Sequence, residues 1–309
     1  MSATRLAPSC PCVLYALALC AAAWSVPSGA QQLEPRAFAP NPTGVSFVSL
    51  STGWTEGDVL ADASSPIQDF EIEYSDVIAG YVRSFAMGSR LASASFIVPY
   101  ITGEATGLVN GEPARAPRSG PGDLRMRFTL NLLPGSALDP ASFARAAPDR
   151  TLGFSVTIAA PTGEYYDDKL VNIGTNRWAV RPEFGGLRQF GRWTLDGSIA
   201  AWFYEDNDDY LGGSRRSQDP ITVIQGHVSY TFAPRLWLGL GLTWYTGGES
   251  SVDGVDRGDE QDNTRAGLTL AVPVGQRHSV KLAWSTGTSA RAGGDFDSLS
   301  LAWQFFWLD

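Results

Sequence analysis

The chain has 309 residues, a formal charge of −9 at pH 7 and only 18% charged residues, below the usual quarter. An acidic chain of this kind is a poor partner for nucleic acid or for an anionic membrane surface. Its length allows two ordinary domains or one large all-β domain, and 33 glycines with 11% aromatic residues favour strands joined by turns.

Residues 1–30 predict a secretory signal peptide that is cleaved from the mature chain. Arg5 is the single charge before Glu34, and the apolar run from Cys12 to Trp24 is too short to span a bilayer, which takes about 20 residues. A buried helix of a soluble domain is the alternative. All three cysteines lie in this segment, so the mature chain is expected to have no disulfide, no thiolate metal ligand and no cysteine nucleophile.

After residue 30, no run approaches the roughly 18 apolar residues of a transmembrane helix. If the mature chain enters a membrane, it must do so with strands. Residues 31–43 are predicted to be an N-terminal periplasmic segment, and residues 44–309 to form the membrane domain.

From residue 44 onward, apolar residues alternate with small or polar ones at a period of two, which indicates strands. In the last strand, Leu299, Leu301 and Trp303 fall on one face, and serines and an alanine fall on the other. Most segments have about ten residues or more, which suits tilted membrane strands. Twelve strands are predicted, at residues 44–56, 74–86, 89–102, 121–133, 150–162, 176–190, 192–206, 218–232, 235–249, 263–274, 277–290 and 295–308.

The connections alternate between short and long. Tight turns are predicted at residues 87–88, 191, 233–234 and 275–276, with longer polar loops between. Short periplasmic turns and longer outer loops are the plan of an outer-membrane barrel. One turn, residues 134–149, is too long for this plan and is expected to be a small periplasmic excursion. We therefore predict an all-β fold, a single closed antiparallel transmembrane barrel of about twelve strands.

A soluble β-sandwich is the alternative fold. The second face of most strands is mainly glycine, serine, threonine and alanine with spaced charges, as in a narrow lumen. Aromatic residues also gather near strand ends, where a membrane interface selects them. Interfacial positions are predicted for Trp178, Trp193, Trp202, Tyr204, Trp237, Trp244, Tyr245, Trp284, Trp303 and Trp307.

Two motifs flank one predicted loop: PTGEY, which begins at Pro161, and NIGTNRW, which begins at Asn172. From about residue 40 to the end, the chain resembles the MetA-pathway phenol-degradation family. The resemblance implies an exported, transporter-like outer-membrane barrel linked to the breakdown of aromatic compounds. It defines no reaction, so no catalytic residues are carried over from it. Such barrels commonly end on an aromatic residue that the barrel-assembly machinery reads, whereas here Leu308 and Asp309 follow Trp307.

Charged and polar residues on the inner face of the strands are candidates for a solute path, because charges there must pair or meet water. The alternative is an ion-pair network that plugs the barrel. Cations outnumber acids five to two in this set, so a permeant anion such as an aromatic carboxylate or phenolate is one hypothesis. The set is Arg125, Arg127, Arg181, Glu183, Asp196, Gln225, His227, Arg265 and Lys281.

The stretch YYDDKLVNIGTNRW, residues 165–178, is predicted to be an outer loop and its rim. Asn172, Thr175, Asn176 and Arg177 are candidates for a gating or solute-capturing role, and Trp178 for an interfacial anchor. Asparagine suits tight turns, which gives these residues a structural alternative.

Two acidic runs, residues 205–209 and 253–262, could hold Ca²⁺, but they lack the spacing of an EF-hand loop, so solvated loops are favoured. No metal site or cofactor is predicted. An enzyme is not expected, because His227 and His278 are the only histidines and no Gly-x-Ser-x-Gly motif is present.

The sequence thus predicts an outer-membrane channel or transporter for small, hydrophobic or aromatic solutes, with the lipid bilayer and a small-molecule solute as partners. The alternative is a non-conducting barrel with a structural or surface role. The oligomeric state is left open.

Overall fold

The computed structural model describes residues 34–60, 67–134, 136–145 and 147–308. The predicted signal peptide lies outside the described residues. Among the described residues, no helix has the length and apolar character needed to span a membrane.

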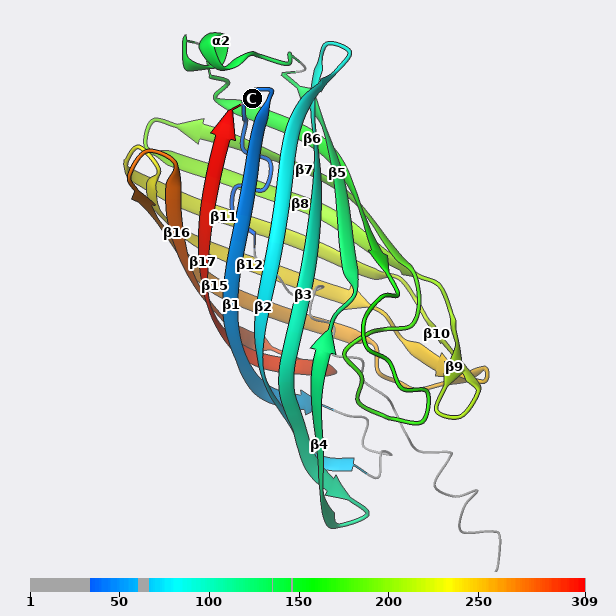
Figure 1. Cartoon of the computed structure of the whole chain (residues 1–309). Coiled ribbons are helices and arrows are strands. Elements are labelled where there is room, and N and C mark those ends of the chain that lie inside the picture. The colour runs from blue at the N-terminus through cyan, green and yellow to red at the C-terminus, as the bar shows by residue number, and fades with distance from the viewer. Residues whose placement is uncertain (1–33, 61–66, 135, 146, 309) are drawn as a thin grey trace, which may run out of the picture.

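Twelve long antiparallel strands form one closed barrel, as the sequence predicts (Figure 1). Each strand pairs with the next along the chain, and β1 closes the barrel by pairing with β17 from Val45↔Leu308 to Leu60↔Gly293. The barrel strands are β1 (Val45–Leu60), β2 (Ile67–Met87), β3 (Arg90–Val109), β5 (Leu124–Leu133), β6 (Arg150–Ala160), β7 (Ala179–Phe190), β8 (Trp193–Tyr204), β11 (Ile221–Ala233), β12 (Leu236–Gly247), β15 (Gln261–Val274), β16 (His278–Ser289) and β17 (Gly293–Leu308).

Some elements differ from the predicted pattern. The strands β1, β2 and β3 extend several residues further toward the loops than predicted, and β3 turns back into an extra strand, β4 (Glu112–Pro121). The loops carry a small four-stranded sheet of β9 (Asn207–Tyr210), β10 (Ser214–Gln218), β13 (Ser250–Val252) and β14 (Val255–Asp256). A strand outside the bilayer needs no apolar face. The sequences of the strand extensions, β4 and the small sheet therefore lack the regular alternation of apolar and polar residues from which strands were predicted.

The connection between β5 and β6 contains the short helix α2 (Pro140–Arg145). Asp139 caps it by accepting hydrogen bonds from the backbone N–H groups of Ala141 and Ser142. These bonds hold the pKa of Asp139 below its usual value. The connection also pairs with the start of the barrel, because Thr43 N–H donates to the carbonyl of Leu138.

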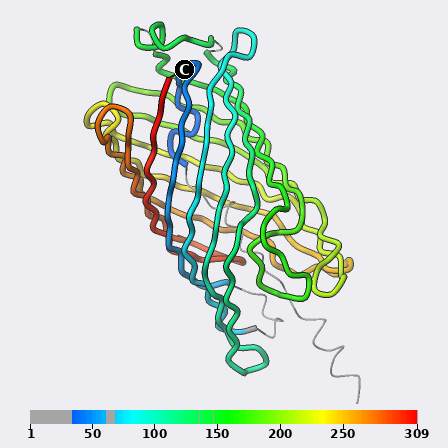
Figure 2. The backbone as a smooth tube through the Cα atoms, viewed as in Figure 1, coloured from blue at the N-terminus to red at the C-terminus, as the bar shows by residue number. Residues whose placement is uncertain are grey.

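The two ends of the barrel differ. The C-terminus, α2 and the short turns lie at the upper end in Figure 1, which we call the turn end. The end that holds β4, β9 and β10 is the loop end. Figure 2 shows the same path as a tube and makes the steep tilt of the strands clear.

The outer wall is apolar and exposed. On β12, Leu238, Leu240 and Leu242 are between 41 and 57% exposed. The same alternation, with every second residue apolar and facing outward, occurs around the barrel, because one face of every strand meets lipid. Trp193, Trp244, Trp284 and Trp303 also point outward, as expected for interfacial rings.

Four of the predicted interfacial aromatics are wrongly placed, because they lie on the inner face. Trp202, Trp237 and Tyr245 are at most 7% exposed, and the Tyr204 ring stacks on that of Trp202. Each of the four lies at an alternating position of its strand that faces the lumen. This alternation therefore predicts the direction of a side chain better than a position near a strand end does.

Neighbouring residues of β17 point to opposite sides of the barrel wall, so a pair of substitutions can test which side faces lipid and which faces the lumen. Leu301→Arg places a charge on the lipid face and is expected to destabilise the barrel by about 2–4 kcal/mol if it lies near the bilayer midplane. Ser300→Arg, one position away, points into the lumen and should cost less. Urea unfolding of the refolded variants in liposomes measures both, and equal losses would contradict the assignment.

Candidate functional site

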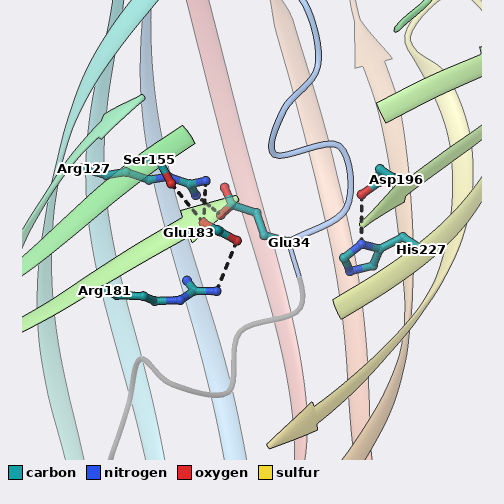
Figure 3. Close-up of polar contacts among 7 residues, drawn as sticks. All are labelled: Glu34, Arg127, Ser155, Arg181, Glu183, Asp196 and His227. Carbon is teal, nitrogen blue, oxygen red and sulfur yellow. Dashed lines mark hydrogen bonds and ion pairs between the residues drawn. The ribbon is translucent and has the colours of Figure 1, made fainter. Parts of the chain in front are cut away.

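All nine predicted lumenal residues lie at inward positions, but they do not form one network. Arg127, Arg181 and Glu183 come together on β5 and β7 (Figure 3). The Glu183 carboxylate is 3% exposed and accepts hydrogen bonds from Arg127 Nη2 at 2.9 Å, Arg181 Nη2 at 3.3 Å and Ser155 Oγ at 3.1 Å. Two guanidinium groups thus compensate one buried carboxylate, whose charge would be costly to bury alone.

A second pair lies on β8 and β11, where His227 Nδ1 is 2.9 Å from Asp196 Oδ1. Both side chains are almost fully buried. His227 Nε2 has no hydrogen-bond partner among the described residues. A histidine–carboxylate pair alone does not make a catalytic triad, and within the described ranges no nucleophile contacts the free ring nitrogen.

Residues 34–38, which lead toward β1, lie inside the barrel against its inner wall, and we call them the N-terminal plug. The Arg36 guanidinium donates to Ser229 Oγ at 2.9 Å and Thr231 Oγ1 at 2.9 Å, and it lies 4.5 Å from the ring centre of Trp237. The backbone N–H of Arg36 donates to Asp196 Oδ1 at 3.1 Å. Arg36 therefore ties the plug to β8, β11 and β12.

Phe38 is the second anchor of the plug and is buried between two glycines of the wall. A Cβ atom at Gly185 would lie 2.2 Å from the Phe38 ring, and one at Gly153 would lie 2.8 Å from it. Thr151 Oγ1 donates to the Phe38 carbonyl at 2.6 Å, and Arg127 lies 5.4 Å from the ring centre. The glycines on β6 and β7 thus make room for the plug.

The sequence predicts that residues 31–43 form a periplasmic segment. The part of this segment that the structure describes begins at Glu34 and contacts the inner wall of the barrel. Glu34 pairs with Arg127 at 3.2 Å. A short irregular segment has no period, so the sequence pattern gives no hint of this position. Once the position of this segment in the barrel is known, the side chains of Arg36 and Phe38 and the small residues on the facing strands are seen to fit it.

Arg265 and Lys281 lie on the other side of the barrel, on β15 and β16. A cavity of about 210 Å³ runs along this side, and Pro35 of the plug borders it. Seven hydroxyl side chains line the cavity, together with Asp76, Arg265 and several glycines and alanines. The hydroxyl residues are Ser51, Thr55, Tyr74, Thr269, Ser285, Ser298 and Ser300.

A larger groove of about 460 Å³ at the loop end is acidic, and the sequence did not single it out. Four acidic residues form a row across neighbouring strands. Glu56 on β1 is paired in register with Asp297 on β17 and with Glu73 on β2, and Glu73 is paired with Glu104 on β3. Like charges in such positions repel, and Arg115 offsets one of them, Glu104. No group of three or more His, Cys, Asp or Glu in the described ranges is arranged to hold a metal ion.

The rim motif lies at the loop end, where hydrogen bonds fix its shape. The Asn172 side chain bonds the backbone N–H and carbonyl of Tyr166. Asp123, at the start of β5, accepts from Gly163 N–H at 2.9 Å, Thr175 N–H at 2.9 Å and Thr175 Oγ1 at 2.6 Å. Asp123 therefore joins both halves of the loop between β6 and β7.

The last residues of the motif connect this loop to the small outer sheet. Asn176, at a positive φ of 52°, donates to Asn207 Oδ1 at 3.0 Å, and Arg177 donates to Gln218. Arg177 is buried 4.4 Å from the ring centre of Tyr204, and burial lowers its pKa to about 10. Trp178, the predicted interfacial anchor, is 47% exposed.

The same loop also carries apolar residues into the barrel mouth. Val171 packs in a buried cluster with Val59, Ile72, Ala105 and Phe296, from four other strands. The loop of residues 161–178 is thus a latch held by Asp123 on one side and by this cluster on the other.

A closed antiparallel barrel with an apolar outer wall and a polar, partly filled lumen defines a β-barrel of the outer-membrane type. Residues 55–305 match the model of the family described as putative MetA-pathway of phenol degradation. The match covers most of the chain, and the protein belongs to this family.

Solved structures share the fold. The COG4313 outer membrane channel from Pseudomonas putida F1 is 24% identical, with a TM-score of 0.76 over 89% of this chain and 100% of that chain. A mutant of the TodX monoaromatic hydrocarbon channel is 10% identical, with a TM-score of 0.50 over 89% of this chain and 93% of that chain. No curated protein matches the sequence.

The Arg36 anchor gives a test of the plug. Arg36→Ala removes the side-chain hydrogen bonds to β8 and β11 and should raise the time spent in a conducting state about tenfold or more, since bonds to charged groups contribute about 1.5–3 kcal/mol each. Single-channel recording in planar bilayers measures this. Arg90→Ala, at the exposed turn end, is the control, and an unchanged record for Arg36→Ala, where the native chain itself conducts, would contradict the anchoring role.

The latch can be tested at Asp123. Asp123→Asn replaces a carboxylate that accepts three hydrogen bonds, so the loop should detach more often and trypsin should cleave at the exposed Lys169 about tenfold faster. Heat-modifiable gel mobility should be retained. Asp219→Asn, an exposed change in a loop at the same end, is the control, and equal cleavage rates would show that Asp123 does not hold the latch.

Proposed function

We propose that the protein is an outer-membrane channel that lets small hydrophobic or aromatic solutes pass, and that it has no catalytic activity. The observation that carries this proposal is the cavity beside the plug, which is enclosed by the barrel wall and lined by polar groups. A concave site with a small number of placed charged groups is a usual form of a small-molecule site.

The relatives support the solute class. The family is described by its link to phenol degradation, and one solved structure of the same fold is described as a monoaromatic hydrocarbon channel. An aromatic solute is therefore the first candidate here too. A permeant aromatic anion would find Arg265 at the cavity, and Lys281 lies on β16, another strand of that side.

The envelope context follows from the same fold. A signal peptide would export the chain, the barrel-assembly machinery would insert it, and the apolar outer wall would face the lipid bilayer of the outer membrane. The long loops would then face the outside, which places the latch on the cell surface and the plug on the periplasmic side. An acidic chain remains a poor partner for nucleic acid.

A non-conducting barrel with a structural or surface role is the second candidate. The plug favours it, because Arg36 and Phe38 occupy the lumen and Glu183 is neutralised by ion pairs that span the wall. The two candidates differ in what happens when the plug moves. A channel should then conduct, whereas a structural barrel should show no conductance.

Uptake by whole cells separates the two. Cells that produce the protein should take up radiolabelled phenol or benzoate faster than cells in which it is deleted, at concentrations low enough for the outer membrane to limit entry. Reintroducing the unaltered chain should restore the rate. Equal uptake with and without the protein, together with no conductance step for either the native chain or Arg36→Ala, would establish the non-conducting barrel.

A further inference from the structure

Arg125 is a cation on the inner face of β5 that no acceptor binds. Across the described part of the chain, its guanidinium forms no hydrogen bond and no salt bridge. Asp123 is the carboxylate that acts most strongly on this charge, but both Asp123 oxygens already accept hydrogen bonds from Gly163 and Thr175 of the latch. Arg125 therefore brings a positive charge into the lumen without a carboxylate bonded to it.

The strand register places Tyr204 at the same level of the wall as Arg125. Arg125 is paired with Ala159 on β6, and Ala159 is paired with Ala179 on β7. Ala179 is in turn paired with Tyr204 on β8, so three strand spacings of about 4.8 Å separate the two backbones. The two small side chains between them leave room for both long side chains, and the charge of Arg125 acts on the Tyr204 hydroxyl.

Two more arginines reach the same place. The Arg177 guanidinium lies 4.4 Å from the ring centre of Tyr204, and the Arg181 guanidinium lies 5.8 Å from that of Trp202. The two rings are stacked, with 6.3 Å between their centres. The charges of Arg177 and Arg181 also act on the Tyr204 hydroxyl. Three cations, from β5, the latch and β7, therefore gather around this pair of rings.

The group offers hydrogen-bond donors and lacks acceptors. Arg177 Nη1, Arg181 Nε and the Trp202 indole N–H are buried and have no hydrogen-bond partner in the described ranges. Arg177 and Trp202 are each only 5% exposed. Glu183 does not supply the acceptor, because two arginines and a serine already bind its carboxylate. Buried donors without partners are costly, so this arrangement calls for an acceptor from outside the wall.

The charge and shape of the donors define that acceptor. A neutral hydrocarbon would leave both the positive charges and the free N–H groups unmatched. An anion matches both, and hydrogen bonds between ionised groups are about twice as strong as those between neutral ones. The planar guanidinium fits the two oxygens of a carboxylate, which accept a pair of parallel bonds.

We propose that Arg125, Arg177 and Arg181 form a binding site, at the loop end of the lumen, for the carboxylate of a small aromatic acid. The carboxylate accepts from the Arg125 guanidinium and from the free N–H groups of the other two arginines, and the ring lies beside Trp202 and Tyr204. Because Arg177 belongs to the latch, the bound anion also joins the latch to the wall. This inference rests on the proposed function for the ring of the solute, and the arginines supply the site for its charge.

Binding can be measured without transport. Equilibrium dialysis of the purified full chain in detergent should show that benzoate binds at least about tenfold more tightly than benzyl alcohol, which has the ring but no charge. Arg125→Gln should weaken benzoate about tenfold and leave benzyl alcohol unchanged. The native Arg125 side chain makes no hydrogen bond, so this variant should keep its heat-modifiable mobility. Arg125→Lys, which keeps the charge and loses the planar fork, should weaken benzoate less.

Arg188→Gln removes the same charge from an exposed position of β7 and is the matched control, with no expected change in benzoate affinity. Inorganic phosphate, an oxyanion without a ring, tests the occupant and should bind more weakly than benzoate. Unchanged benzoate affinity in Arg125→Gln, or tighter binding of phosphate than of benzoate, would overturn the proposal.

A second readout places the site at the latch. Benzoate should slow trypsin cleavage at the exposed Lys169 in the native chain and not in Arg125→Gln, because a ligand that binds the closed latch stabilises it. Equal cleavage of the native chain with and without benzoate would contradict a site that includes Arg177. A failed uptake experiment does not alter these binding results, and a failed dialysis experiment leaves uptake to decide whether the barrel conducts.

Discussion

The pairing of β1 with β17 is the constraint on which the rest of this structure depends. A lipid bilayer offers no water to the peptide groups of a strand edge, so every strand inside it must have two neighbours. The 16 register pairs between β1 and β17 meet that requirement and fix the number of barrel strands at twelve. Twelve strands enclose more space than the side chains of an eight-stranded barrel fill and less than the channel of a sixteen-stranded porin. The interior therefore has to be partly filled by something else.

The plug and the arginines fill one side of this space, and small residues leave the other side open. On β6 and β7, Gly153 and Gly185 admit Phe38, and Glu183 holds Arg127 and Arg181 against the wall. On the side formed by β15, β16, β17, β1 and β2, the inward residues are mostly serine, threonine, glycine and alanine, and the cavity lies there. The cavity in this barrel therefore follows one wall and not the central axis.

How far the sequence predicts this arrangement depends on the constraint that acts on each part. The twelve strands and the inward position of residues such as Glu183 and His227 follow from alternation, because the bilayer imposes one apolar face on every strand. Trp202 and Tyr245 were misplaced because an aromatic residue near a strand end fits a filled lumen as well as an interface. The plug was missed because a short segment packed by single contacts leaves no periodic pattern. Asp76, which borders the cavity, was passed over because the first three strands have no clean faces.

Two segments, the latch and the plug, fill parts of the lumen, and different contacts hold each of them. The latch at the loop end buries Val171 in an apolar cluster and bonds Thr175 to a carboxylate, and both contacts are lost when it opens. The plug is held at two points of different chemistry. At Arg36, a charged guanidinium donates to hydroxyl groups of the wall, and each such bond contributes about 1.5–3 kcal/mol. At Phe38, withdrawal would expose an apolar ring and leave a gap against two glycines. Both anchors therefore oppose movement of the plug, and Pro35, which borders the cavity, directly precedes the Arg36 anchor.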